Sequence, residues 1–400
     1  MPGEQRSRVP YQSRQGAAAS RLRAGRQRLL DGVGSMRAAV TESPVSLYAA
    51  AVLRGGYGFL FLALLLREFP HRDEMWGPGS AWTPALSAEL SDETGFRSIL
   101  AVSDSPLYFE ACYGLAVVVT VLFMLGWRTR ATSVAFAVIV ASFHSRAIFM
   151  TDGGDNLLLL MALYLCFTAC GRRWSLDARR TRLRADSVRT KPLRVPAQLG
   201  IVRRQATTVL HNCAMFVIAV QVAFLYGSAG LYKVQGSFWN DGTALHYVLN
   251  LDLFRPWPAL SHMMDQQTMF IASAGYMAVL IQVGFPFVLF SKAKYVVLPM
   301  LLGMHLMIAV LLGLPFFSGA MIVADAVFLS DGFFTFLAGL WGRTGRSALD
   351  SRQSGASAEL PGSVVPAQYR ADGVTVGPEA PAARGTSGQG SSASRGARPA

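Results

Sequence analysis

The chain has little charge for its length. Of its 400 residues, 15% are charged and 52% are hydrophobic. A soluble domain usually carries about a quarter charged residues, so this chain has too little polar surface for a globule surrounded by water. The scarcity of charge excludes an ordinary soluble domain and predicts a membrane protein.

Cysteine is also scarce, and the four cysteines lie inside hydrophobic runs. They are Cys112, Cys166, Cys170 and Cys213. Their positions do not match a metal-ligand set, and a disulfide framework normally needs more cysteines in a shorter chain. The chain also lacks a glycine-rich phosphate loop and a Gly-x-Ser-x-Gly elbow. We therefore expect no metal site.

Basic residues outnumber acidic ones and give a net charge of +13. Recognition patterns for nucleic acid are absent, and the arginines cluster between hydrophobic runs. This distribution is typical of segments that flank a membrane, so we expect membrane lipid as a partner and no nucleic acid.

The hydrophobic runs predict an all-α polytopic bundle of about eight transmembrane helices, since about 20 apolar residues cross the hydrocarbon core. The runs cover approximately 45–66, 107–126, 131–150, 156–171, 208–231, 268–290, 295–314 and 316–340. Pro286, Pro299 and Pro315 lie in or beside the later runs, where we expect kinks or broken helices.

The counts of lysine and arginine predict the orientation. Eight precede the first run, three follow it, eleven lie in 172–207, two follow the fifth run and seven lie in the C-terminal tail. High and low counts alternate through all the loops, which is the positive-inside pattern. This predicts a multi-pass protein of the cytoplasmic membrane with both termini in the cytoplasm.

Both ends differ from the bundle in composition. Residues 1–44 form a basic segment, and residues 341–400 are rich in Gly, Ser and Ala. Neither segment can bury enough apolar surface to offset chain entropy. We expect both to be disordered, flanking a transmembrane domain at residues 45–340.

Polar residues gather in the loop after the third run. This loop, "SRAIFMTDGGDN", contains Arg146, Asp152, Asp155 and Asn156. The topology puts them on the outer face, where they are candidate ligand-binding residues. A capped turn at the start of the next helix explains Asp152 equally well.

Lys233 follows the fifth run and emerges on the same face. It is either an anchor at the lipid boundary or a base. Trp239, Asp241 and His246 crowd into the next 15 residues and predict an ordered cap at the interface. A lysine beneath such a cap loses part of its hydration, which favours the neutral form that accepts protons.

Two further polar residues lie deep in the hydrophobic runs. His305 either forms a hydrogen bond to a neighbouring helix or has a catalytic or ligand-binding role. Arg54 needs a partner, and an ion pair with Glu110 or Asp325 is expected. We also predict that Arg146, Asp155, Asn156, Lys233 and Ser318 border one outward-facing cavity, with His305 deeper along its wall.

Four segments resemble the HTTM family, the membrane domain of vitamin K-dependent gamma-carboxylase and of many bacterial proteins. They are "AVLRGGYGFLFL", "DGGDN", "AGLYKVQGSFWNDGTAL" and "MHLMIAVLLGLPFFSGAMI". The resemblance covers residues 45–340. It implies that Lys233 matches the lysine thought to deprotonate the hydroquinone in the carboxylase, with a quinone as cofactor and chemistry on the non-cytoplasmic face.

The chain also departs from the carboxylase. Tyr232 stands beside Lys233 where the carboxylase has a second lysine, and no large soluble region follows the helices. These departures argue against glutamate carboxylation.

Three functions stay open. The first is an enzyme that binds a quinone-like or other apolar molecule and modifies an extracytoplasmic substrate, with Lys233 as base and His305 beside it. The second is a non-catalytic component that helps to mature or export a small secreted peptide with a co-encoded partner protein, as the family's toxin-maturation members suggest. The third, a transporter, is weaker because the halves show no repeat symmetry.

Overall fold

The computed structural model describes Gln27 and residues 41–95, 98–186, 197–289 and 291–339. Disorder was predicted for residues 1–44 and 341–400, and almost all of these lie outside the described residues. Within it, residues Ser43 to Val45 are tied to a helix by Asn212. The Asn212 amide donates to the Ser43 carbonyl at 3.0 Å and accepts from the Val45 N–H at 2.9 Å.

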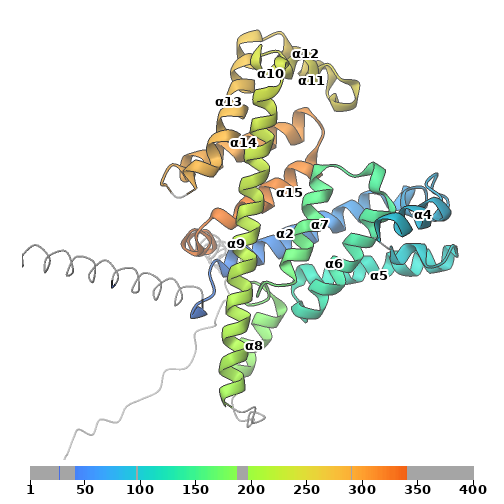
Figure 1. The fold of residues 1–400 in the computed structure, drawn as a ribbon, viewed down its shortest axis with the longest axis vertical. Helices are drawn as coiled ribbons and strands as arrows, with labels where there is room; N and C mark the ends of the chain where they lie inside the picture. The colour runs from blue at the N-terminus through green and yellow to red at the C-terminus, as the bar shows by residue number, and fades with distance from the viewer. Residues whose placement is uncertain (1–26, 28–40, 96–97, 187–196, 290, 340–400) are drawn as a thin grey trace, which may run out of the picture. The chain divides into compact units, whose positions relative to one another are not determined.

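The described residues are helical and contain no strand (Figure 1). The helices are α2 (Leu47–Arg67), α3 (Arg72–Trp76), α4 (Pro84–Thr94), α5 (Pro106–Leu125), α6 (Thr129–Arg146), α7 (Gly153–Leu165), α8 (Leu176–Asp186), α9 (Ala197–Gln235), α10 (Ser237–Asn240), α11 (Ala244–Leu249), α12 (Pro258–Asp265), α13 (Thr268–Val288), α14 (Lys294–Leu311) and α15 (Pro315–Asp325). A 3-10 turn at Ala326–Phe328 and a further helix at Asp331–Gly339 follow α15.

Five of these helices are long and apolar enough to cross a membrane: α2, α5, the Gly200–Gln235 part of α9, α13 and α14. A sixth span results if Pro315–Phe328 and Asp331–Gly339, which meet at a bend of 108°, count as one broken span. The all-helical fold with several membrane-type helices is therefore confirmed, while length and composition support five or six spans among the described residues.

The other two predicted runs are helical but do not qualify as spans. α7 has 13 residues, about 20 Å at 1.5 Å per residue, which is shorter than a hydrocarbon core of about 30 Å. α6 is polar at both ends, where Arg130 and Arg146 lie, and most of it is buried against neighbouring helices. A helix enclosed by protein does not need an apolar surface on all sides.

The helices pack as two groups joined by α15. In the first group α2 packs on α5 and α7, and α6 packs on both α5 and α7. In the second, α13 lies along α9 and contacts α14 (Figure 1). α15 contacts α14 as well as α2 and α7, so polar residues on α15 can meet residues from either group.

Aromatic side chains fill the first group. Phe123 and Phe136 stack with ring centroids 4.2 Å apart, and Phe61 lies edge-on to Phe136 and Phe143. In the second group α9 and α13 approach closely at Gly230, where an added Cβ would lie 2.8 Å from the Val283 nitrogen.

The three prolines lie in or beside the later helices, and a break between α14 and α15 precedes Pro315. Pro286 lies in the last turn of α13, and Pro299 lies inside α14 without ending it. Pro315 is the first residue of α15, where its missing N–H costs no hydrogen bond.

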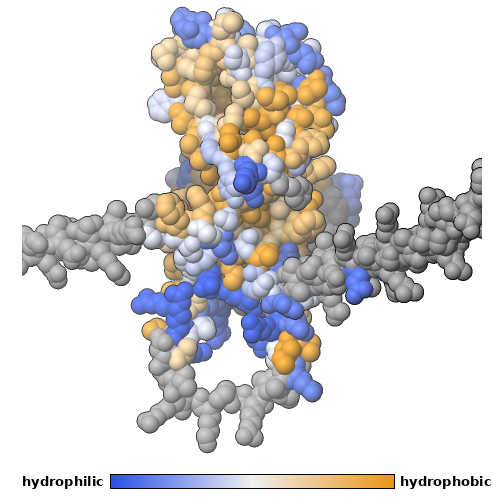
Figure 2. Space-filling model, turned by 90° about the vertical axis from the view of Figure 1, so that its left-hand side faces the viewer, coloured by the Kyte–Doolittle hydropathy of each residue, from blue (hydrophilic) through white to orange (hydrophobic). Residues whose placement is uncertain are grey.

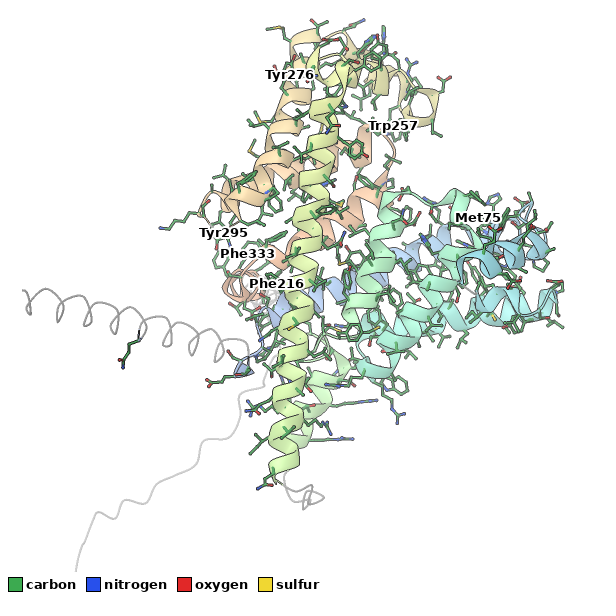
Figure 3. The ribbon with its side chains drawn as sticks, viewed as in Figure 1. Met75, Phe216, Trp257, Tyr276, Tyr295 and Phe333 are labelled. Carbon is green, nitrogen blue, oxygen red and sulfur yellow. The ribbon has the colours of Figure 1, made fainter. Side chains whose placement is uncertain are left out.

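Hydrophobic residues dominate the middle of the face shown in Figure 2, and hydrophilic residues gather toward its upper and lower ends. Exposed aromatic side chains such as Phe216, Tyr276 and Tyr295 contribute to the helix surfaces (Figure 3). Such a surface suits contact with lipid.

Candidate functional site

Lys233 lies in the last turn of α9 under a tryptophan. Its Nζ donates to the Ala229 carbonyl at 3.4 Å and lies 5.2 Å from the centre of the Trp239 ring. The side chain is half-buried. The predicted cap thus covers the lysine, with Trp239 as the covering residue.

The cap is attached to α13. The Tyr276 hydroxyl donates to the Asn240 carbonyl at 2.9 Å, which fixes the end of α10 (Figure 3). α10 follows α9 after one residue, Gly236, so Trp239 folds back toward the end of α9. The position of the tryptophan is therefore set by a short turn and one interhelical hydrogen bond.

A hydrogen-bonded group of three side chains lies deeper in the same part of the molecule. Tyr226, His305 and Asp325, which we call the buried cluster, come from α9, α14 and α15 and are 1%, 2% and 9% exposed. The Tyr226 hydroxyl donates to Asp325 Oδ2 at 2.9 Å and lies 3.0 Å from His305 Nε2.

The tautomer of His305 depends on the charge of Asp325. When Asp325 is ionised, the single hydroxyl proton of Tyr226 goes to Asp325, and Tyr226 accepts from His305 Nε2–H. In the neutral ring Nδ1 then carries a lone pair. The buried cluster therefore presents a proton acceptor at Nδ1.

Helical periodicity explains why the buried cluster lies near Lys233. Tyr226 precedes Lys233 by seven residues, and two helical turns put both on one face of α9. Ser318 and Asp325 have the same spacing on α15. Lys233 and Tyr226 are therefore about 10 Å apart along the axis of α9.

Aromatic rings surround the buried cluster. Phe285 lies edge-on to Tyr226 at 5.0 Å, and Phe317 lies edge-on to His305 at 6.0 Å. An apolar environment of this kind strengthens electrostatic interactions and makes unpaired polar atoms costly.

Several polar atoms here nevertheless have no hydrogen-bond partner among the described residues: His305 Nδ1, Asp325 Oδ1, Ser318 Oγ and Gln282 Oε1. Buried polar atoms are paired in most proteins. The arrangement can therefore accept further hydrogen bonds from a polar group on an otherwise apolar ligand.

The Asp152–Asn156 turn begins α7. Asp152 accepts from the N–H groups of Gly154 and Asp155 at 2.6 and 3.1 Å, and Asp155 accepts from the Asp152 N–H at 3.0 Å. The Asn156 amide donates to the Asp152 carbonyl at 3.0 Å. This is a capping box, so the capped turn expected as one explanation of Asp152 is confirmed.

The turn also contacts α15 through a glycine. A Cβ added to Gly154 would lie 2.7 Å from Phe317 Cα, so only glycine fits without a shift. The Phe317 ring in turn contacts His305. The "DGGDN" turn is thus connected to the buried cluster through one aromatic residue.

Asp155 also lines a small cavity of about 90 Å³ between α2, α6 and α7. Arg67, His144 and Thr151 contribute polar groups to this cavity. Lys233 and Arg146 are not among its lining residues, so this cavity does not unite the predicted outer residues.

Three further predicted site residues lie on other elements than Lys233. Arg146 is buried and donates to the carbonyls of Gly77, at 2.9 Å, and Trp82, so it holds the segment after α3. His246 pairs with Asp265 at 2.6 Å. Asp241 is exposed at the end of α10.

Among the described residues, Arg54 forms no ion pair with Glu110 or Asp325, so the predicted ion pair is wrong. Arg54 donates instead to the carbonyls of Cys170, Phe123, Met124 and Trp174. Of the two expected acids, Glu110 pairs with Arg72 at 2.8 Å and Asp325 accepts from Tyr226. Carbonyls at helix ends lack intrahelical donors, so a guanidinium with five N–H groups can satisfy several at once.

Tyr226 was not predicted, although the sequence contains a signal for it. Tyr226 is a hydroxyl-bearing residue in an apolar run, two turns before Lys233. Asp325 was noticed as a buried acid, but its partner could not be chosen, because that choice depends on which helix faces meet. The described residues contain no group of three or more His, Cys, Asp and Glu side chains that could hold a metal.

Comparison with known proteins gives one distant similarity. The chain is 29% identical over 135 residues to Uncharacterized protein YitO of Bacillus subtilis (strain 168). The matched part covers 33% of this chain and 37% of that protein, little more than a third of its length. No family model matches the chain, and no solved structure matches it.

Proposed function

We propose that this protein is a multi-pass enzyme of the cytoplasmic membrane, a member of the HTTM family, that binds a quinone-like apolar molecule with Lys233 as base. In this proposal the chain crosses the membrane eight times and both termini are cytoplasmic. The enzyme modifies an extracytoplasmic substrate.

The observation that carries the proposal is the placement of Lys233 above the buried cluster. The lysine is half-buried and lies on the side of α9 that carries Tyr226, two helical turns away. Intramembrane ionisable side chains are costly and usually functional. A snorkelling anchor would need neither the tryptophan above it nor the hydrogen-bonded histidine below it.

The chemistry begins with a proton transfer. The ligand reacts in its reduced, hydroquinone form. Neutral Lys233 takes the proton of one ligand hydroxyl, so the O–H bond breaks and an N–H bond forms at Nζ. The resulting ammonium stabilises the oxyanion beside it. The lone pair of His305 Nδ1 can accept a hydrogen bond from a second hydroxyl of the ligand, which would orient it.

Mass spectrometry of quinones co-purified with the protein tests this proposal. We expect a quinone in the wild-type sample and several-fold less in Lys233→Ala. Lys292→Ala, which changes an exposed lysine in the turn before α14, should leave the quinone content unchanged. A wild-type sample without quinone, or equal loss in both variants, would contradict the proposal.

Cysteine labelling in intact cells tests the orientation. Cys213 is exposed and should first be replaced by alanine. A maleimide that cannot cross the membrane should then label Asp241→Cys in the cap and leave Thr181→Cys in α8 unlabelled. The opposite pattern would overturn the proposed sidedness.

A second candidate is the non-catalytic component that works with a partner protein on a secreted peptide. It is favoured by the exposed apolar residues of the cap, which include Phe238, Tyr247, Leu253 and Trp257 (Figure 3). A partner would cover this surface. This candidate predicts that substitutions in the cap abolish function while Lys233→Arg retains it.

A further inference from the structure

A basic crevice lies where α8 and the start of α9 meet the turns before α6 and after α7. It has a volume of about 1200 Å³ and is lined by seven arginines, among them Arg130, Arg172, Arg182 and Arg204. The lining contains one acid, Asp177. This part of the chain is at the lower end of α9 in Figure 1.

The Asp177 carboxylate is hydrogen-bonded to the start of α6. It accepts from the N–H groups of Arg128 and Thr129, at 3.0 and 2.7 Å, and from the Thr129 hydroxyl at 2.7 Å. Burial acts to raise the pKa of Asp177, but these hydrogen bonds outweigh it and the pKa is lowered. The one carboxylate of the crevice is thus held at the helix start as its cap.

The arginines face one another across the crevice. Burial lowers the pKa of Arg172, and the like charges of Arg204 and Arg130 lower it further. Among the described residues, no carboxylate lies within ion-pair distance of these three arginines. The folded chain therefore keeps a concentrated positive charge that an anion would relieve.

The crevice continues onto an apolar surface. Leu210, Val217 and Phe224 follow the crevice residue Arg203 at intervals of seven residues, which puts them on its side of α9, and they are 48%, 43% and 68% exposed. α9 is membrane-type from Gly200 onward. An occupant here would meet arginines at one end and an apolar helix surface at the other.

We propose that this crevice binds the headgroup of an anionic phospholipid that carries two phosphates, with its acyl chains along α9. Guanidinium groups bind phosphate oxygens in pairs, which gives strong and oriented hydrogen bonds. The volume exceeds that of a typical small-molecule site, about 300–1,000 Å³, and suits a headgroup with more than one phosphate. Basic pockets between membrane helices are suited to such lipids.

Native mass spectrometry of the detergent-purified full chain tests the proposal. The probes are cardiolipin with two phosphates, phosphatidylglycerol with one, zwitterionic phosphatidylcholine, and inorganic phosphate. We expect cardiolipin to bind most tightly. Arg172→Gln/Arg204→Gln should weaken it on the order of tenfold or more, and Arg179→Gln/Arg180→Gln, which removes equal charge from α8 outside the crevice, should change it less than about twofold.

The other outcomes would overturn the proposal. Unchanged binding by the Arg172→Gln/Arg204→Gln variant, or equal loss in both pairs, would show that binding is not located in the crevice. Displacement of cardiolipin by similar concentrations of inorganic phosphate would assign the site to free phosphate. If the double variant does not fold, Arg204→Gln alone, at an exposed position, should still weaken cardiolipin several-fold, and no weakening would refute the site.

Discussion

Arg54 and the buried cluster are both polar groups enclosed by hydrophobic helices, yet their hydrogen bonding differs. Arg54 is 2% exposed and donates to four backbone carbonyls, which ties the end of α5 to the turn after α7. The buried cluster joins three side chains from three helices and leaves His305 Nδ1 and Asp325 Oδ1 without partners among the described residues. Arg54, whose three guanidinium nitrogens are all hydrogen-bonded, stabilises the fold. The buried cluster keeps unpaired acceptors that can bind a ligand.

The largest expected effect is on folding, at Arg54. Arg54→Met keeps the side-chain length but removes the guanidinium donor of four carbonyls, and a buried carbonyl left unpaired costs about 1–3 kcal/mol. We expect the free energy of unfolding to fall by several kcal/mol, seen as loss of monodisperse protein in size-exclusion chromatography. Arg67→Met, at an exposed position at the end of the same helix, should purify like wild type.

If Arg54→Met folded as well as the wild type, the contrast between the two centres would be lost. The four carbonyls would then find other donors, and Arg54 would be a candidate for a role in function.

A substitution in the buried cluster should lower activity as well as stability. Tyr226→Phe removes the hydroxyl that joins His305 to Asp325 but keeps the ring against Phe285. His305 Nε2 and Asp325 Oδ2 are then unpaired, at about 1–3 kcal/mol each, and we expect activity to fall about 10²-fold because the histidine is no longer oriented. Thermal unfolding and restoration of a deletion strain's phenotype measure the two effects.

Asp325→Asn tests whether the three side chains act as a unit. In that case the Tyr226→Phe/Asp325→Asn double variant should be hardly less active than either single variant. Fully multiplicative losses would show that the residues act separately.

A smaller effect is expected at the contact between the "DGGDN" turn and α15. Gly154→Ala brings a Cβ within 2.7 Å of the Phe317 backbone, and overpacking of this kind costs about 1–3 kcal/mol. Gly153→Ala is a matched control, because its Cβ would meet only the Phe317 ring at 3.4 Å. Equal melting temperatures for the two variants would refute the close contact.

The smallest effect should occur in the cap, at the His246–Asp265 pair. Burial acts to raise the pKa of Asp265, but hydrogen bonds from Asn250 and His246 outweigh it and lower the pKa. A lowered carboxyl pKa stabilises the fold above the unfolded value, about 3.9, and this stabilisation is lost as pH falls through the folded value. Hydrogen exchange in α11 and α12 should therefore increase below about pH 4, and Asp265→Asn should exchange faster already at neutral pH.

The sequence predicted the helices well. In an apolar environment a long apolar run can pair its backbone N–H and C=O groups only by forming a helix or a closed barrel. The sequence also identified Lys233 and His305 as polar residues needing an explanation. The number of spans stays a prediction, because α6 has polar ends, α7 is short, and both are partly buried against other helices.

The partners of the buried groups were the least predictable part. Arg54 and Asp325 have opposite charges and lie in helices that touch, α2 and α15, so an ion pair was reasonable. The structure instead turns Asp325 toward Tyr226 and directs Arg54 toward helix-end carbonyls. Such choices depend on helix rotation, which hydrophobic runs alone leave undetermined.

The most direct test of the central claim is to compare Lys233→Arg with Lys233→Ala in restoring the phenotype of a deletion strain, with expression and melting temperature measured alongside. If Lys233 is a base, both variants should fold like wild type and fail together, because arginine stays protonated near neutrality. If Lys233→Arg restores function fully, the lysine is an anchor and the proposed role as base is contradicted.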